Sequence, residues 1–283
     1  MHASSAAGAG LLQHILVRVG IVGLGLMGGS LALALRAQRP DWELVGQDTD
    51  PAPLARALDT GLISAGPVQE ADVVVLAAPI PALPELLADL SGYRGVVTDL
   101  ASTKVRVMSW AAAAGVDMVG GHPMCGRELS GLAAADPNLF RGAPWVLTRD
   151  EPVVTGLVEA VGSRPIFMDA QLHDRLVAGV SHAAFLLSTA YVLALAGSPQ
   201  WSEMQEVAGS GFREMSRLAA GDPELYAAIV STNREPIAEA VRAAEMSLAR
   251  LRRHLEAGDP RLVELFEEAK QVRDRWANGA RNG

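Results

Sequence analysis

Residues 121–128, GHPMCGRE, bring a histidine, an arginine, a glutamate and the chain's only cysteine into one short stretch. A neutral imidazole accepts a proton near neutral pH, so His122 is a candidate general base. The same letters also fit an ordinary turn, since a His-Pro pair stands beside glycine. The stretch alone leaves both interpretations open, and the choice depends on the sequence around it.

A glycine-rich stretch, GLGLMG at residues 23–28, lies between a predicted strand and a predicted helix. In that context Gly23 makes a tight turn, Gly25 admits a pyrophosphate against the backbone, and Gly28 lets the helix approach the strand. Leu26 and Met27 open the helix, where free N–H groups and the helix dipole favour phosphate. The stretch therefore predicts a dinucleotide site.

Asp48 ends the second predicted strand, about twenty residues after the glycine stretch. A carboxylate there accepts a hydrogen bond from the ribose 2′-hydroxyl and repels a 2′-phosphate, which favours NAD over NADP. Asp50, directly before Pro51, is instead the predicted N-cap of the next helix. NAD is the expected cofactor, and no metal site is expected.

Short apolar runs separated by helical patterns must position these residues. Strands read as continuous apolar runs between helices indicate a parallel sheet covered on both faces. We therefore predict an α/β fold, with a Rossmann-type, doubly wound, NAD-binding domain over 17–169. The predicted strands are 17–22, 43–48, 71–78, 94–100, 116–121, 143–148 and 164–169.

After about residue 170 the strand pattern stops, and helical periodicity broken by Gly-Ser-Pro and Gly-Asp-Pro takes over. We predict an all-α helical domain over 170–283 for substrate binding and dimerisation. Residues 1–16 have neither the basic nor the apolar segment of a signal peptide and are expected to be a disordered tail.

Composition narrows the function. A chain of 283 residues that is 49% hydrophobic and 20% charged is long enough for two soluble domains. Its net charge of −8 disfavours nucleic acid, and its single cysteine favours a reducing cytoplasm. The most apolar run, 182–197, is interrupted by polar residues and is too short to span a bilayer, so no membrane partner is expected.

Several motifs occur in an order and spacing that resemble the prephenate and arogenate dehydrogenases of tyrosine biosynthesis, over roughly residues 17–275. They are GLGLMGGS, TDLASTK, GGHPMCGRELSG, LHDRLVAGVSHAAF, GSGFREMSRLAAGDPELY and STNRE. The family moves hydride from C4 of a 4-hydroxycyclohexadienyl ring to NAD while carbon dioxide leaves and the ring becomes aromatic. The resemblance implies an oxidoreductase that converts prephenate to 4-hydroxyphenylpyruvate. Arogenate or dual specificity is the alternative.

The resemblance also implies roles for residues around the opening stretch. His122 matches the acceptor of the hydroxyl proton, and Ser102 matches a serine that hydrogen-bonds both this histidine and the substrate hydroxyl. Glu128 matches an acidic residue at the pocket mouth that pairs with charges across the domain boundary. Cys125 has no matching role and is expected to be a packing residue.

In the helical half, Arg217 matches the arginine that holds the ring carboxylate, for which a planar guanidinium is suited. His182 matches a histidine that faces the site, and Tyr226 matches an aromatic residue that lines the pocket. A solvated arginine, a buried helix histidine and a core tyrosine remain the alternatives. Arg213 and Lys104 add local positive charge or lie on the surface.

One position departs from the family pattern. Relatives specific for prephenate often carry a second histidine three positions after the first, where this chain has Phe185. The substitution removes a polar group near the substrate and leaves the choice between prephenate and arogenate open. With no match to a regulatory or chorismate mutase domain, a monofunctional enzyme is expected.

The apolar run at 182–197 and the alanine- and leucine-rich stretch at 218–251 predict a homodimer built through the helical half, as in the family.

Two other classes of function fit these motifs less well. Dehydrogenases of 3-hydroxy acids or imines use a helix lysine or other pocket groups in place of the HPxxGxE histidine. A non-enzymatic NAD-binding protein does not need Ser102, His122 and Arg217 together.

Overall fold

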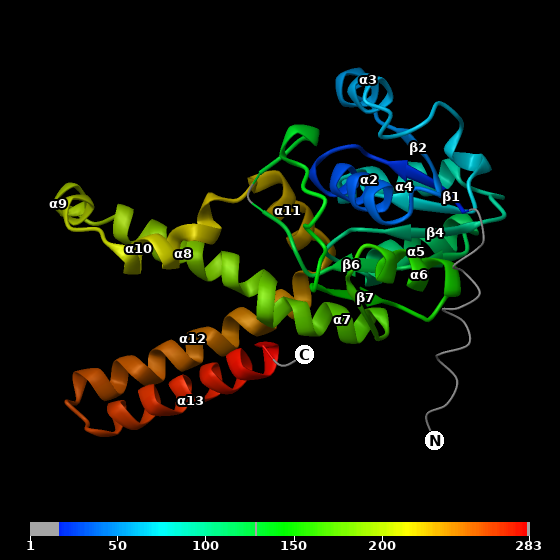
Figure 1. Cartoon of the computed structure of the whole chain (residues 1–283). Coiled ribbons are helices and arrows are strands. Elements are labelled where there is room, and N and C mark those ends of the chain that lie inside the picture. The colour runs from blue at the N-terminus through cyan, green and yellow to red at the C-terminus, as the bar shows by residue number, and fades with distance from the viewer. Residues whose placement is uncertain (1–16, 128, 282–283) are drawn as a thin grey trace.

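The computed structural model describes residues 17–127 and 129–281. Its first half contains a five-stranded parallel sheet in the order β2-β1-β3-β4-β5 (Figure 1). The strands are β1 (Arg18–Val22), β2 (Glu43–Gln47), β3 (Val73–Leu76), β4 (Val96–Asp99) and β5 (Met118–Val119). The order reverses beside β1, as in doubly wound nucleotide-binding folds.

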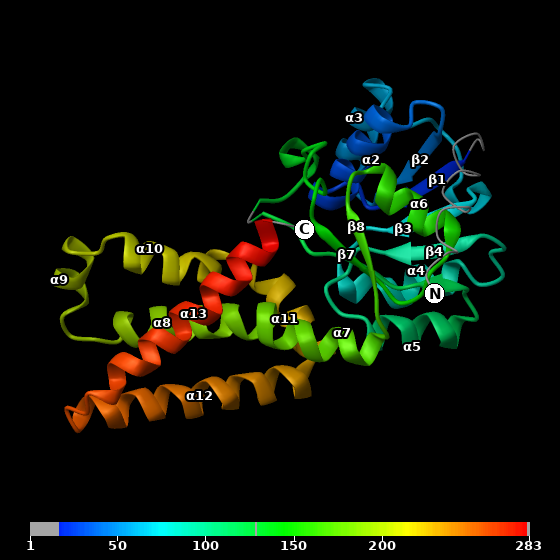
Figure 2. The same ribbon diagram turned by 60° about the horizontal axis from the view of Figure 1, so that its bottom comes forward.

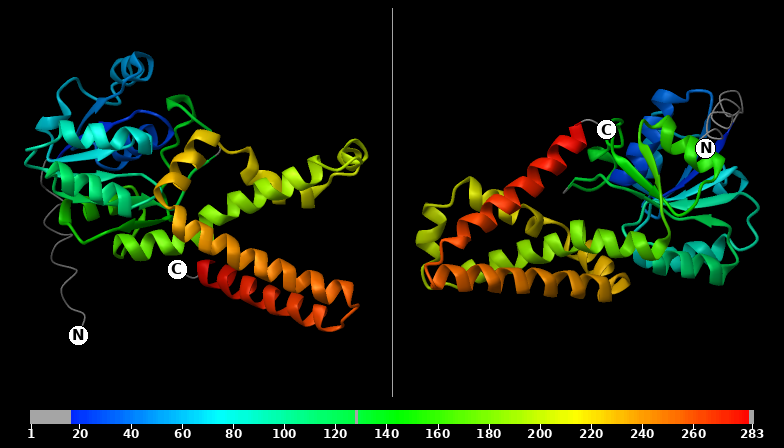
Figure 3. Two further views of the ribbon diagram at one scale, coloured as in Figure 1. Left: turned by 180° about the vertical axis from the view of Figure 1, so that it is seen from behind. Right: turned by 90° about the horizontal axis from the view of Figure 1, so that it is seen from below.

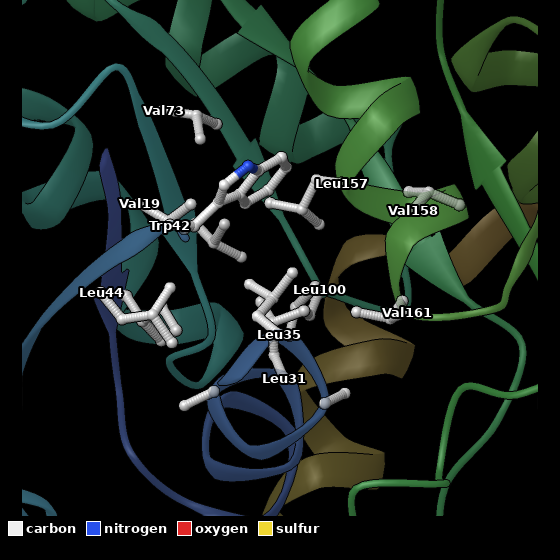
Figure 4. Close-up of a cluster of buried hydrophobic side chains, with 14 of the residues drawn as sticks. Val19, Leu31, Leu35, Trp42, Leu44, Val73, Leu100, Leu157, Val158 and Val161 are labelled. Atoms are coloured by element: carbon white, nitrogen blue, oxygen red, sulfur yellow. The ribbon is translucent and has the colours of Figure 1, made fainter. Parts of the chain in front are cut away.

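Helices cover both faces of this sheet because its strands are apolar on both sides. Successive residues of β3 point to opposite faces, so Val73 and Val75 lie in one core cluster and Val74 and Leu76 in another. The first cluster, with Trp42 beside helix α2, is drawn in Figure 4. The helices are α2 (Leu26–Gln38), α3 (Pro51–Asp59), α4 (Leu83–Asp89), α5 (Val105–Ala114) and α6 (Pro152–Ala160).

The N-cap prediction for α3 is confirmed. Asp50 Oδ1 accepts a hydrogen bond from the N–H of Ala52 at 2.9 Å, and Pro51 is the first residue of the helix. A proline suits that position because its missing N–H would have no partner there.

The last predicted strands differ from a continuous parallel sheet. They form a second sheet of β6 (Gly121–Pro123), β7 (Pro144–Leu147) and β8 (Arg164–Phe167), in which β6 and β7 are antiparallel. Among the described residues between β6 and β7, the one helical element is the 3₁₀ turn η4 (Leu132–Ala134), and none forms an α-helix. Parallel pairing needs a longer crossover, which α6 provides between β7 and β8.

The second half is helical, as predicted, and extends away from the sheets (Figures 1 and 2). Its long central rod is α7 (Ala170–Val177), a π-helical turn η5 (Ala178–His182) and α8 (Ala183–Ala196). The remaining elements are α9 (Trp201–Glu206), α10 (Ser210–Ser216), η6 (Arg217–Ala220), α11 (Pro223–Thr232), α12 (Arg234–Glu256) and α13 (Arg261–Arg281). Figure 3 shows α12 and α13 as a hairpin.

The rod at Ala170–Ala196 is long and apolar enough to cross a membrane by composition, and 33% of its most apolar window is buried in the protein. Composition alone is weak support for a membrane span, because core helices of soluble proteins pass the same test. This segment also carries buried polar residues, His173, Asp174 and His182, on the face that packs against the rest of the protein.

Candidate active site

The glycine loop joins β1 to α2, and two of its glycines are required by packing. Gly23 has a φ of 95°, and a Cβ there would lie 2.7 Å from the carbonyl oxygen of Ala77. A Cβ on Gly28 would lie 1.9 Å from the carbonyl oxygen of Gly23. These positions therefore match the tight turn and the close helix–strand approach that the sequence predicts.

Gly25 differs, because a Cβ there would meet no protein atom within 4 Å. Packing does not require glycine at this position, whereas a bound group approaching the backbone would. Gly25 is also the N-cap of α2 and supplies no side-chain cap, so the N–H groups of the first turn, including those of Leu26 and Met27, can face an anion. The loop thus fits a dinucleotide phosphate.

Asp48 lies next to this loop at the carboxyl end of β2. Its Oδ2 accepts the N–H of Leu24 at 2.6 Å, and its Oδ1 accepts the N–H of Asp50 at 2.9 Å. The carboxylate is therefore fixed by the backbone beside the glycine loop. Each oxygen has a second lone pair with which it can accept a ribose hydroxyl.

His122 lies on β6 and is the first member of a hydrogen-bonded chain. Its Nδ1 is 2.8 Å from Nε2 of His173, and His173 Nδ1 is 2.7 Å from Oδ1 of Asp174. A carboxylate only accepts, so His173 Nδ1 carries a proton, and in the singly protonated ring Nε2 is the acceptor. His122 then donates from Nδ1 and keeps a lone pair on Nε2, as a general base requires.

The surroundings keep His122 neutral. Burial lowers its pKa well below the usual value, and the positive charge of Lys104 lowers it further; a proton on His173 or His182 would act in the same direction. The side chain is 8% exposed. A neutral imidazole with a bare Nε2 can accept a proton from a substrate hydroxyl.

A buried ion pair fixes the strand that carries His122. Lys104 Nζ binds the carboxylate of Asp99 and donates to the carbonyl oxygen of Gly121 at 2.6 Å. Asp99 Oδ1 accepts the N–H of Gly121 at 2.9 Å, and its Oδ2 accepts that of Ala101 at 3.0 Å. Lys104, which the sequence left between a pocket and a surface role, is fully buried, and together with Asp99 it holds both backbone groups of Gly121, the residue before His122.

His182 is on the π turn of the helical half and is buried. Its Nδ1 lies 3.2 Å from Nδ2 of Asn233, while its Nε2 has no hydrogen-bond partner among the described residues. Burial lowers the pKa of His182 to about 4, against an opposing effect of Asp174. His182 is therefore neutral at neutral pH.

Tyr226 and Phe185 form the next part of this region. Their rings stack with centroids 3.9 Å apart and planes within 4° of parallel. Tyr226 Oη donates to the carbonyl oxygen of Leu218 at 2.7 Å, which connects the stack to η6. Arg217, the first residue of η6, is exposed. The buried hydroxyl of Ser188 fixes the same turn by donating to Met215 O at 2.7 Å and accepting from Ala219 N at 3.0 Å.

The remaining candidates of the first half are Ser102, Glu128 and Cys125. Ser102 is half-buried in the β4–α5 connection, and the described partner of His122 is His173 instead, so the orienting bond expected from Ser102 is not formed. Glu128 lies outside the described residues. Cys125 packs against the core, as predicted, and burial raises the pKa of its thiol to about 11.

Sequence reasoning missed the residues that orient the two histidines, which are His173, Asp174 and Asn233. All three lie within motifs that carried the family resemblance, LHDRL and STNRE, but no role was assigned to them. The adjacent His-Asp pair was the available signal, because a carboxylate commonly orients an imidazole. Asn233 gave no comparable signal, since its partners are distant in sequence.

Comparisons with known proteins agree with this geometry. A family described as "Prephenate dehydrogenase, nucleotide-binding domain" matches residues 31–163, and "Prephenate dehydrogenase, dimerization domain" matches residues 169–268. The prephenate dehydrogenase of Lactococcus lactis subsp. cremoris is 30% identical over 270 residues, which cover 89% of this chain and 75% of that protein.

Solved structures are similar over nearly the whole chain. The prephenate dehydrogenase of Aquifex aeolicus, solved with hydroxyphenyl propionate and NAD⁺, is 30% identical with a TM-score of 0.85, and the match covers 93% of this chain and 99% of that one. The Synechocystis arogenate dehydrogenase is 28% identical with a TM-score of 0.79, over 92% of this chain and 99% of that one. Both the sheet half and the helical half are thus shared with these enzymes.

Proposed function

We propose, from the premise that the chain belongs to the prephenate dehydrogenase family, that it catalyses the NAD-dependent oxidative decarboxylation of prephenate to 4-hydroxyphenylpyruvate. The observation that carries the proposal is the chain from Asp174 through His173 to His122. This chain leaves His122 Nε2 as a proton acceptor in the family's glycine-loop architecture.

His122 and Ser102 have different roles in the reaction. His122 Nε2 accepts the proton of the ring C4 hydroxyl as the C4–H bond breaks, and Ser102 orients that hydroxyl. NAD⁺, when bound, accepts the hydride. The C1–carboxylate bond then breaks, carbon dioxide leaves, and the electron pair of that bond makes the ring aromatic. The C4 oxygen takes a proton back from protonated His122, which gives the phenol of the product. The protein needs no covalent intermediate, because aromatisation drives the step.

Substrate and cofactor recognition are assigned to separate groups of residues. Arg217 binds the ring carboxylate through its guanidinium fork, while His182, Glu128 and Tyr226 contact the substrate. Gly23, Gly25, Leu26, Met27, Gly28 and Asp48 bind NAD. We assign the cofactor role to residues 17–169 and the substrate and assembly roles to residues 170–283.

Arogenate, or both substrates, is the second candidate. It is favoured by Phe185, which presents an aromatic ring stacked on Tyr226 where a histidine would present a polar group. Initial rates with prephenate and with arogenate, each with NAD⁺ and NADP⁺, test both substrate and cofactor. Faster turnover with NADP⁺ would contradict the role of Asp48, and no NADH from either substrate would overturn the function.

The assembly is proposed to be a homodimer joined through the helical half. Large apolar side chains remain exposed there, and the matching family domain is described as a dimerization domain. A cytoplasmic location is proposed because the single cysteine is unpaired and the family's reaction belongs to amino-acid biosynthesis. Light scattering of the full chain measures its mass in solution.

A further inference from the structure

Asp174 takes part in the hydrogen-bond networks of both His122 and His182, through its carboxylate for the first and its backbone carbonyl for the second. Its carboxylate accepts from His173, and also from the N–H groups of Lys104 at 2.8 Å and Val105 at 2.9 Å. Its backbone carbonyl oxygen accepts from Asn233 Nδ2 at 2.8 Å. One residue therefore anchors the partner of His122 and the partner of His182.

The carbonyl of Asp174 fixes which way the Asn233 amide faces. A carbonyl oxygen only accepts, so the amide group beside it is the –NH₂ and not the oxygen. The second hydrogen of that –NH₂ points to His182 Nδ1, 3.2 Å away. His182 Nδ1 must then be the acceptor, and the proton of the neutral ring resides on Nε2.

We infer that Asn233 is a positioning residue, which holds His182 in the tautomer opposite to that of His122. The site then presents one proton acceptor, His122 Nε2, and one proton donor, His182 Nε2–H. Asn233 is buried on the turn between α11 and α12, and STNRE is the motif that contains it. The donor role of His182 toward a ligand rests on the proposed function, whereas the tautomer itself does not.

The proton on His182 Nε2 needs a hydrogen-bond acceptor. His182 Nε2 is buried without a partner among the described residues, and a buried donor without an acceptor is unfavourable. It lies on a π-helical turn, a distortion common at functional sites. We therefore assign its partner to an oxygen acceptor in the ternary complex, either the carboxamide of the nicotinamide or an oxygen of the ring substrate.

Nitrogen-15 NMR of the wild-type full-length protein tests the tautomer without any turnover. Long-range ¹H–¹⁵N spectra should show His182 protonated at Nε2, and His122 and His173 protonated at Nδ1. His182→Gln identifies the His182 signals by their loss. Protonation of wild-type His182 at Nδ1 would overturn the inference, even if the protein proves to be an active prephenate dehydrogenase.

Two additions to the same sample distinguish the acceptor. A shift of the His182 Nε2–H signal with NAD⁺ alone identifies the cofactor, and a shift only after adding 3-(4-hydroxyphenyl)propionate identifies the substrate site. No shift in either sample would overturn the donor role. Asn233→Asp should move the proton of His182 to Nδ1, because a carboxylate accepts where the amide donated; an unchanged Nε2–H tautomer there would contradict the role of Asn233.

Kinetics of a matched pair provides the second test. The amide nitrogen of Gln can replace Nε2 of a histidine, whereas that of the shorter Asn cannot. His182→Asn should lower kcat/KM for prephenate by about 10²-fold, the effect of losing one well-placed donor, and His182→Gln should restore most of it. Equal losses in both variants would overturn the donor role.

Discussion

The sheet half and the helical half differ in where their apolar side chains lie. The sheet half buries its Val, Leu and Ile residues on both faces of the parallel sheet, in two core clusters. Few described hydrophobic side chains of the helical half are buried, and these are Val177, Ala178, Ala183, Phe185, Ala228, Ile229 and Ile237. Many large ones are exposed instead, among them Leu193, Val207, Met246, Leu248, Leu255, Phe266 and Trp276.

Most buried apolar side chains therefore belong to the sheet half, whereas much of the apolar surface of the helical half is exposed, as is common where another chain binds. The two halves nevertheless share one site. His122 belongs to the sheet half, but His173 and Asp174, which orient it, belong to the helical half. The cofactor loop, by contrast, is built within the sheet half alone.

Removing the base should produce the largest effect. His122→Ala is expected to lower kcat by about 10²–10⁴-fold, the usual range for the loss of a general base. NAD⁺ affinity should be unchanged, because the glycine loop does not include His122. Stopped-flow rates and NAD⁺ titration measure the two separately. A change in KM alone would mean that His122 only positions the substrate.

Removing the hydrogen bond that His173 of the helical half makes with His122 should lower the rate less. His173→Phe keeps a ring of similar size but removes the acceptor for His122 Nδ1–H. We expect kcat to fall by about 10–10²-fold, as for other groups that orient a functional histidine. His254, a histidine on α12 that pairs with Asp259, provides the control substitution to Phe. Equal losses in both variants would contradict the orienting role.

The exposed leucines of α12 predict which surface forms the interface of the proposed dimer. Leu248 and Leu255 lie seven positions apart on α12, on one face of the helix, and each is 67% exposed. Burying such side chains contributes about 1.5–3 kcal/mol each, so changing both to Glu should weaken dimerisation by at least about 10²-fold. Leu58→Glu on α3 of the sheet half is the control. Sedimentation of all three proteins tests this, and an unchanged double variant would place the interface elsewhere.

Substitutions at two glycines of the β1–α2 loop should affect different properties, protein stability at Gly28 and NAD⁺ binding at Gly25. Gly28→Ala should lower the free energy of unfolding by about 1–3 kcal/mol, because the new Cβ meets the backbone of Gly23. Gly25→Ala should leave stability nearly unchanged and weaken NAD⁺ binding by about tenfold, since only the pyrophosphate approaches that position. Thermal unfolding and NAD⁺ titration measure both. Normal NAD⁺ affinity in Gly25→Ala would contradict the phosphate site.

Local patterns were sufficient to predict much of the fold. The apolar runs, the glycine loop and the Asp50-Pro51 cap depend on neighbours in sequence, and the structure agrees with each. The antiparallel pairing of β6 with β7 was not predicted, because it depends on the absence of a crossover helix in a loop of irregular sequence. Apolar content alone cannot distinguish the two pairings.

The site was less predictable because its contacts join distant segments. Asp174 and Lys104 are separated by 70 positions, and Asn233 and His182 by 51. A single sequence indicates which residues are chemically capable, such as His122, but it does not show which partner orients them. That is why Ser102 was assigned the orienting bond that His173 makes.

The pH dependence should show the smallest effect and tests whether the two halves bury the base together. His122 has its pKa lowered by burial and by the neighbouring charge of Lys104. The neutral, active form therefore persists as the pH falls below 6.5. We expect kcat/KM to change by less than about twofold between pH 8 and pH 6, where an exposed histidine of pKa 6.5 would lose about fourfold.

The same shift has a consequence for stability. Because the pKa of His182 is about 4 in the folded state, below its value of about 6.5 in the unfolded chain, unfolding takes up protons at acid pH. Its contribution to stability is fully present above pH 6.5 and is lost as the pH falls toward 4. Urea unfolding of wild type and His182→Gln should therefore differ in pH dependence between pH 7 and 4, with the wild type losing more. Two results together would contradict the burial of His122 and His182 between the sheet half and the helical half. These are a fourfold loss of kcat/KM by pH 6 and identical unfolding profiles for the two proteins.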